Sequence, residues 1–330
     1  MSQLKRGAGK TDKKQTLRKE CEPPLSPINK KVNRPPDQKE KSYSIRPRVL
    51  SETCEDKLIS KEDYHFIRNL IYQHSRINLG ADKQALVTSR LAKRLRLLRI
   101  DRFSEYIALL RGPLLDDELS HLVDAISTNH THFFRETQHF DFLKAHVLPK
   151  CGRTLAVREP LRIWSAASSS GEEPYTLAIL LSENLPTTPE GSWEITASDI
   201  SSRILEKARQ GIYPTDRLAQ VPMEWQRKYF QRGTGDWEGY LRIRDELRNR
   251  VAFYRLNLLE PKYPFEKKFH VIFCRNVMIY FDRATQQDLV PKLAEALVPG
   301  GYLMVGHSES LGGIHHGLKT IQPAVYQKPD

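Results

Sequence analysis

Two adjacent glutamates stand in a stretch of small residues at 165–175 (SAASSSGEEPY), between a predicted strand and a predicted helix. Small residues let a ligand approach the backbone closely, and Pro174 is favourable in the first turn of a helix. Glu172 and Glu173 would repel a phosphate group, which a glycine-rich loop binds through backbone N–H groups. The loop therefore favours a cationic ligand such as S-adenosylmethionine, although the glutamates could equally serve only to stabilise the helix dipole.

Polar residues also close two further predicted strands. Asp199, in ASDIS at 197–201, is placed to accept hydrogen bonds from two ribose hydroxyls, although it could equally cap the helix that begins near Ser201. Asn276 follows the apolar run VIFC at 271–274 and could hold the methionine or adenine part of the ligand, with Val277 and Tyr280 as walls. That segment alone is equally consistent with a buried strand end. In their order along the chain, the three loops indicate a class I methyltransferase sheet rather than a dehydrogenase.

These loops depend on an alternation of strands and helices in the C-terminal half. Apolar runs predict strands at 161–166, 193–197, 271–274, 302–305 and 324–327, and helical patterns occupy 172–185, 201–210 and 283–297. Such alternation is typical of a mostly parallel sheet, which binds ligands beyond the carboxyl ends of its strands. Between 213 and 253 the glycine-rich run GTGDWEGY (233–240) predicts an inserted hairpin or three-stranded unit.

The N-terminal half is helical from about residue 57 to 111, and a second helical stretch covers 116–126. The clearest helix spans 85–99, where Val87, Leu91, Leu95 and Leu98 share one face. The remaining arc is basic, and is either a solvated face or a surface for a partner. Its cations are Arg90, Lys93, Arg94, Arg96 and Arg99.

The formal net charge of +12 could indicate nucleic acid, an anionic membrane surface or an acidic protein as partner. Much of the excess lies in the Lys/Pro-rich residues 1–50, which cannot build a core, so we expect a disordered basic tail. No apolar run reaches about 18 residues and the N-terminus lacks a signal-peptide core, which predicts a cytoplasmic protein not embedded in a membrane. The four cysteines form no CxxC pair, so we expect free thiols and no metal site. They are Cys21, Cys54, Cys151 and Cys274.

The chain resembles the CheR-type chemotaxis receptor glutamate O-methyltransferases in stretches that follow the family's order and cover most of 60–330. They are TNHTHFFRE (128–136), RIWSAASSSGEEPYTLAI (162–179), ASDIS (197–201), ILEKARQGIYP (204–214), FCRNVMIYFD (273–282) and LVPGGYLMVGHSESL (297–311). The histidines at 130 and 132 and the long basic tail depart from the usual pattern, but they remove no matched contact.

The resemblance implies an α/β fold: a class I, Rossmann-like methyltransferase domain at 156–330, with a small β-subdomain inserted at about 213–253. An all-α domain (51–127) and a linker with a cofactor-contacting motif (128–155) would precede it. The basic tail (1–50), expected from composition and not from the resemblance, would come before both. The implied cofactor is S-adenosylmethionine, with S-adenosylhomocysteine as product. The implied reaction is glutamate methylation on the cytoplasmic helical domain of methyl-accepting chemotaxis receptors, by a monomer.

The resemblance also implies individual roles. The basic helix at 85–99 would face the receptor's methylation helices. Apart from the resemblance, we hypothesise that Arg135 orients the substrate carboxylate. The insert with Gly233 and Gly235 is similar to that of members tethered by a short C-terminal receptor peptide. The implied cofactor contacts are Asn129, Thr131, Arg135, Glu172, Asp199, Asn257, Leu258, Asn276 and Val277.

Such a reaction requires no general base, because a glutamate carboxyl titrates near about 4.3 and is already ionised at neutral pH. Two other functions stay open. One is methylation of nucleic acid with the tail as a phosphate-binding arm, although no Asn/Asp-Pro-Pro-Tyr motif and no basic patch interleaved with aromatic residues occurs. The other is a binding module that senses S-adenosylmethionine or its demethylated product without catalysis.

Overall fold

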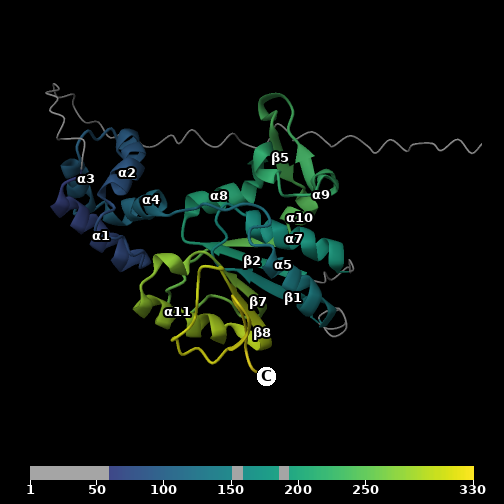
Figure 1. Ribbon diagram of the computed structural model, residues 1–330. Coiled ribbons are helices and arrows are strands. Elements are labelled where there is room, and N and C mark those ends of the chain that lie inside the picture. The colour runs from purple at the N-terminus through teal and green to yellow at the C-terminus, as the bar shows by residue number, and fades with distance from the viewer. Residues whose placement is uncertain (1–58, 151–158, 186–192) are drawn as a thin grey trace, which may run out of the picture.

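The computed structural model describes residues 59–150, 159–185 and 193–330. The basic tail predicted at 1–50 lies outside these residues, as do Cys21, Cys54 and Cys151. Cys274 is a buried free thiol at the end of a strand. The described chain forms a small helical domain beside a larger sheet domain (Figure 1). In this part of the chain, every helix is too short or too polar to cross a membrane.

The helical domain packs around a core that α2 supplies with Val87, Leu91 and Leu95, as its periodicity predicts. Leu98 is only half-buried at the end of that helix. Ser60 begins the domain as an N-cap, since its hydroxyl accepts a hydrogen bond from the backbone N–H of Asp63. The helices are α1 (Lys61–Ser75), α2 (Gln84–Leu98), α3 (Phe103–Leu110) and α4 (Leu115–Ile126).

The sheet domain is built on one seven-stranded sheet of order β6-β2-β1-β7-β8-β10-β9. The first five strands in this order run parallel, and β10 and β9 are antiparallel additions. The mostly parallel sheet predicted from the alternating pattern is therefore confirmed. Its strands are β1 (Leu161–Ser165), β2 (Trp193–Asp199), β6 (Val251–Arg255), β7 (Phe269–Cys274), β8 (Leu297–Val305), β9 (Lys319–Gln322) and β10 (Val325–Gln327).

Helices cover both faces of this sheet, so neighbouring residues of a central strand enter different cores. On β1, Ile163 packs with Tyr175 of α7, whereas Trp164 packs with Leu289 of α11 on the other face. Ser201 caps α8 and Asp282 caps α11, each accepting a backbone N–H. The helices are α5 (Gln138–Phe142), which continues as a π-helical turn (Leu143–Val147), α7 (Glu172–Asn184), α8 (Ser202–Gln210) and α11 (Arg283–Glu295).

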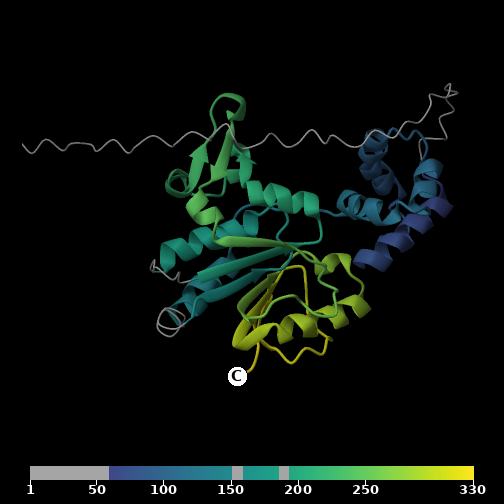
Figure 2. The same ribbon diagram turned by 180° about the vertical axis from the view of Figure 1, so that it is seen from behind.

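The predicted insert is a separate three-stranded antiparallel sheet of order β3-β5-β4. It stands at the far end of α8 and projects away from the main sheet (Figure 2). After it, β6 returns the chain to the main sheet beside β2. The elements of the insert are β3 (Ile212–Pro214), α9 (Met223–Tyr229), β4 (Phe230–Arg232), β5 (Tyr240–Ile243) and α10 (Asp245–Arg248).

Candidate active site

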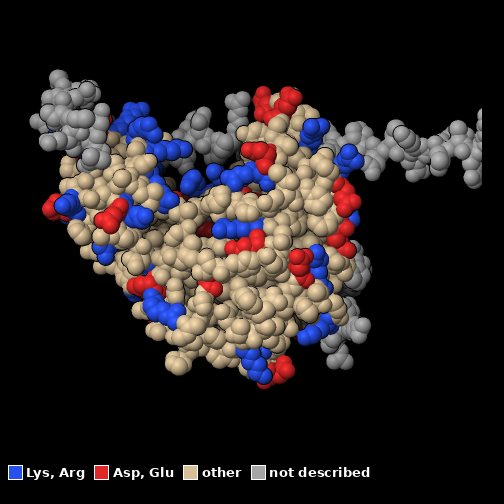
Figure 3. Space-filling view, viewed as in Figure 1, with Lys and Arg blue, Asp and Glu red and all other residues tan. Residues whose placement is uncertain are grey.

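A cavity of about 340 Å³ lies between the helical domain and the carboxyl ends of β1, β2, β6 and β7. The space-filling view shows the hollow between these two bodies (Figure 3). In the sheet, β2 lies on one side of β1 and β7 lies on the other, so the order of the strands reverses at β1. In an open parallel sheet, such a reversal leaves a crevice at the strand ends, where ligands bind.

Asp199 ends β2 at the floor of this cavity and is almost fully buried. Its two carboxylate oxygens accept hydrogen bonds from the backbone N–H groups of Ser169, at 2.9 Å, and Ser201, at 3.0 Å. Burial raises the pKa of this carboxyl to about 6, although the backbone N–H groups favour its ionised form. Asp199 thus links the loops after β1 and β2 and presents an acceptor to the cavity.

A buried cluster of opposite charges holds the segment before α5 against the sheet. The guanidinium of Arg275 donates to Glu173, at 2.8 Å, and to Glu136, at 3.0 Å, and its side chain is 2% exposed. The same guanidinium donates to the backbone carbonyl of Arg135. Burial opposes ionisation of Glu136, but the Asn276 amide and the Arg275 charge outweigh it and lower the pKa to about 2.

A second buried carboxylate fixes the loop after β7. Glu309 accepts hydrogen bonds from the backbone N–H groups of Asn276, at 2.9 Å, and Met278, at 2.7 Å. Asn276 adopts a left-handed backbone with φ of 56°. Gly306 allows this close approach, because a Cβ there would lie 2.6 Å from the Asn276 amide nitrogen. The amide of Asn276 is thereby held at the wall of the cavity.

Eight of the nine cofactor contacts implied by the resemblance line this single cavity. They are Asn129, Thr131, Arg135, Asp199, Asn257, Leu258, Asn276 and Val277. Glu172 is the exception: it is 2% exposed, lies outside the lining and accepts a hydrogen bond from the Ser170 hydroxyl at 2.6 Å. Its neighbour Glu173 lines the cavity instead, with a charge that Arg275 balances. The contact between Glu172 and the cofactor therefore stays a prediction.

The helical domain supplies a wall that sequence reasoning missed, between Ser75 and Arg90. Asn257 donates to the carbonyl of His74 at 2.9 Å, and the N–H of Asn78 donates to the carbonyl of Tyr280 at 2.8 Å. Tyr72 and Asp282 add a 2.6 Å hydrogen bond between the two domains. Because these contacts join segments about two hundred residues apart in the sequence, no local pattern could reveal them.

The basic strip predicted on α2 is smaller than its sequence suggests. The prediction that Arg94 belongs to this exposed strip is wrong. Its side chain is 11% exposed, and its guanidinium lies 2.6 Å from the buried carboxylate of Glu118. Arg90 turns inward, donates to the carbonyl of Ile126 and to Thr128, and lines the cavity. The exposed cations of the strip are Lys93, Arg96 and Arg99.

In the insert, Gly233 is required by packing, because a Cβ there would lie 1.9 Å from the Trp237 carbonyl oxygen. Gly235 has a positive φ of 60° and open space around it. Both glycines thus have a role in the turn that leads to β5, and their contact with a receptor peptide stays a prediction.

Comparison with known proteins gives two family models that together cover the described body. The model described as CheR methyltransferase, all-alpha domain, matches residues 62–127, and the CheR methyltransferase, SAM binding domain, matches 129–326. A chemotaxis protein methyltransferase of Salmonella typhimurium is 43% identical over 278 residues, which are 84% of this chain and 94% of that protein. One from Borreliella burgdorferi is 41% identical over 273 residues, 82% of this chain and 95% of that protein.

Proposed function

The chain belongs to the CheR methyltransferase family, and we propose that it transfers the methyl group of S-adenosylmethionine to glutamate side chains of methyl-accepting chemotaxis receptors. We place this reaction in the cytoplasm and assign it to a monomer. The observation that carries the proposal is the cavity at the strand ends, which gathers eight of the residues that the resemblance implies as cofactor contacts.

The lining of the cavity fits the methyl donor. Asp199 offers a carboxylate to the ribose hydroxyls, and the amides of Asn257 and Asn276 offer both donors and acceptors. Ile200 and Leu258 provide an apolar surface for the adenine ring. When bound, the donor supplies an electrophilic methyl group on a cationic sulfur.

The chain's own task is to hold a glutamate carboxylate in line with that methyl and to exclude water. Because the carboxylate is ionised at neutral pH, alignment and desolvation can provide the rate enhancement without a base. Arg135 lines the cavity and uses one guanidinium nitrogen to donate to the carbonyl of His130, at 2.8 Å. We assign its remaining donors to the substrate carboxylate.

A basic surface beside the cavity supports an acidic partner. Lys and Arg side chains gather on both sides of the hollow between the helical domain and the insert (Figure 3). Burial, together with the nearby charges of Arg203, Lys93 and Arg217, lowers the pKa of Lys207 on α8. This surface complements a helix that carries glutamates. A receptor C-terminal peptide would add a strand to β3 or β4, the edges of the inserted sheet, and raise the local enzyme concentration.

The test is transfer of tritiated methyl from S-adenosylmethionine to membranes that contain or lack chemoreceptors. We expect label only with receptors present, and its release by mild base as expected for a methyl ester. Asp199→Asn serves as the cofactor-site control and should reduce the rate. Label on nucleic acid, or base-stable label on protein, would refute glutamate as the acceptor. No transfer despite donor binding would favour the sensor module.

A further inference from the structure

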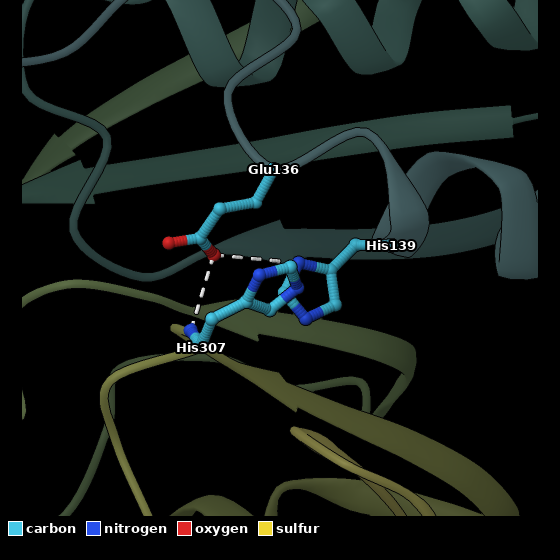
Figure 4. A group of neighbouring side chains, drawn as sticks. All are labelled: Glu136, His139 and His307. Atoms are coloured by element: carbon cyan, nitrogen blue, oxygen red, sulfur yellow. Dashed lines mark hydrogen bonds and ion pairs between the residues drawn. The ribbon is translucent and has the colours of Figure 1, made fainter.

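A cluster of one carboxylate and two imidazoles lies behind the wall of the cavity, outside its lining. Glu136 comes from the segment before α5, His139 from α5 itself, and His307 from the loop after β8. One possible ligand atom from each of the three lies within 4.8 Å of the others. Figure 4 shows the two rings beside one another and the Glu136 carboxylate directed at both residues.

The imidazole nitrogens of His139 could coordinate an ion. The residue is 1% exposed, and neither ring nitrogen makes a well-formed hydrogen bond within the described residues; a weak one joins the ring to the backbone of Ala324. Its Nδ1 lies 3.6 Å from a carboxylate oxygen of Glu136, and its ring centroid lies 4.8 Å from that of His307. A buried polar group without a good hydrogen bond destabilises the fold, and ligation of an ion would remove that cost.

The charges around the cluster favour a cation. Glu136 and Glu173 share the single guanidinium of Arg275, so two carboxylates face one buried positive charge. The carboxylate oxygen of Glu136 that faces His139 also accepts the backbone N–H of His307, at 3.3 Å. Arg275 and the His307 N–H already occupy the two lone pairs of this oxygen, so an ion bound there would replace the longer of the two contacts, the one from His307, and keep that from Arg275.

We propose that Glu136, His139 and His307 form a binding site for a divalent transition-metal ion, with Zn²⁺ the ion that best suits this donor set. Two imidazoles and one carboxylate, with a fourth position open to water, are an established zinc ligand set. Ligand atoms around tetrahedral zinc lie about 3.3 Å apart, given bonds of about 2.0–2.1 Å. His307 is exposed and free to turn inward by the small distance required.

A bound ion would connect the segment that carries Asn129, Thr131 and Arg135 to the loop after β8. This connection would lie on the side of the cavity wall that faces away from the methyl donor. The metal-site proposal therefore does not depend on which group accepts the methyl. It also revises the expectation that the chain has no metal site, which considered cysteine motifs alone.

The test is calorimetric titration of the metal-free full chain with Zn²⁺, together with the visible spectrum of its Co²⁺ form. We expect one equivalent to bind, with histidine and carboxylate ligation in the Co²⁺ spectrum and a higher melting temperature with Zn²⁺. His307→Ala should weaken binding at least about 10-fold and abolish the melting shift. His307 is exposed, so this variant should fold, and His65→Ala on the exposed side of α1 is the matched control.

Three results would overturn the site: no saturable binding to the wild-type chain, equal affinity in wild type and His307→Ala, or a thiolate charge-transfer band. The last would place the ion on cysteine. Loss of receptor methylation in the assay above has no bearing on these readouts, so the two proposals fail separately.

Discussion

Asp199 makes the affinity for the cofactor depend on pH in a definite direction. Burial raises its pKa from 3.8 to about 6, so the folded chain holds a proton there at a pH where the unfolded chain does not. Ribose hydroxyls donate to the ionised carboxylate, so binding should strengthen as pH rises through about 6 and be constant above it. At about pH 5 roughly a tenth of the carboxyl is ionised, which weakens binding about 10-fold relative to pH 7.5.

Asp199→Asn should remove that pH dependence and weaken binding at all pH values. Loss of a charged hydrogen bond costs about 1.5–3 kcal/mol, which corresponds to about 10- to 150-fold in Kd. Glu206→Gln is the matched control, because Glu206 is an exposed acid on the neighbouring helix α8 and should leave the affinity unchanged.

The assay is calorimetric titration with S-adenosylhomocysteine between about pH 5 and 8, with circular dichroism to confirm that each variant is folded. A wild-type affinity that does not change over this range would refute the role of Asp199. The same pH dependence in Asp199→Asn would assign the titration to another group that lines the cavity, such as His132.

Three further variants test other parts of the structure. Arg94→Ala should lower the free energy of unfolding by about 3–5 kcal/mol in urea, because the buried Glu118 carboxylate loses its charged partner and keeps only the Tyr106 hydroxyl. A loss below about 1 kcal/mol would contradict this. The double variant Lys93→Glu, Arg96→Glu should slow receptor methylation about 10-fold at low salt and leave the affinity for S-adenosylhomocysteine unchanged. An unchanged methylation rate would mean that the basic strip on α2 is only a solvated surface. Arg275→Gln should lower the free energy of unfolding by about 3–5 kcal/mol, because it removes the buried charge that pairs with Glu136 and Glu173. It should also weaken S-adenosylhomocysteine binding, because Arg275 holds the segment that carries Arg135. Wild-type affinity in this variant would exclude that positioning role.

Strong local patterns made much of the sheet domain predictable. α7 and α8 begin within one residue of their predicted starts, because a glycine in a left-handed conformation precedes the first and a serine cap precedes the second. Strand β6 was not predicted, because Val251 alone of its residues is fully buried. β9 was missed for a similar reason: it is an edge strand that is mostly exposed.

Long-range ion pairs explain why parts of the site were not predicted. The partners of Arg275 lie 102 and 139 residues away in the sequence, so neither Glu173 nor Glu136 could be matched to it from spacing. Arg94 illustrates the converse, since its position on the polar arc of α2 does not reveal that Glu118 on α4 withdraws it from solvent. Helical periodicity assigns a face, and only tertiary packing decides which cations on that face stay exposed.

The most direct test of the proposed site is a crystal structure of the full chain with S-adenosylhomocysteine. We expect the ligand between the helical domain and the ends of β1, β2, β6 and β7, with its ribose hydroxyls hydrogen-bonded to Asp199 and Asn276 in contact with it. A ligand bound elsewhere on the chain, or in this cavity without contact to Asp199, would contradict the assignment of the cofactor site.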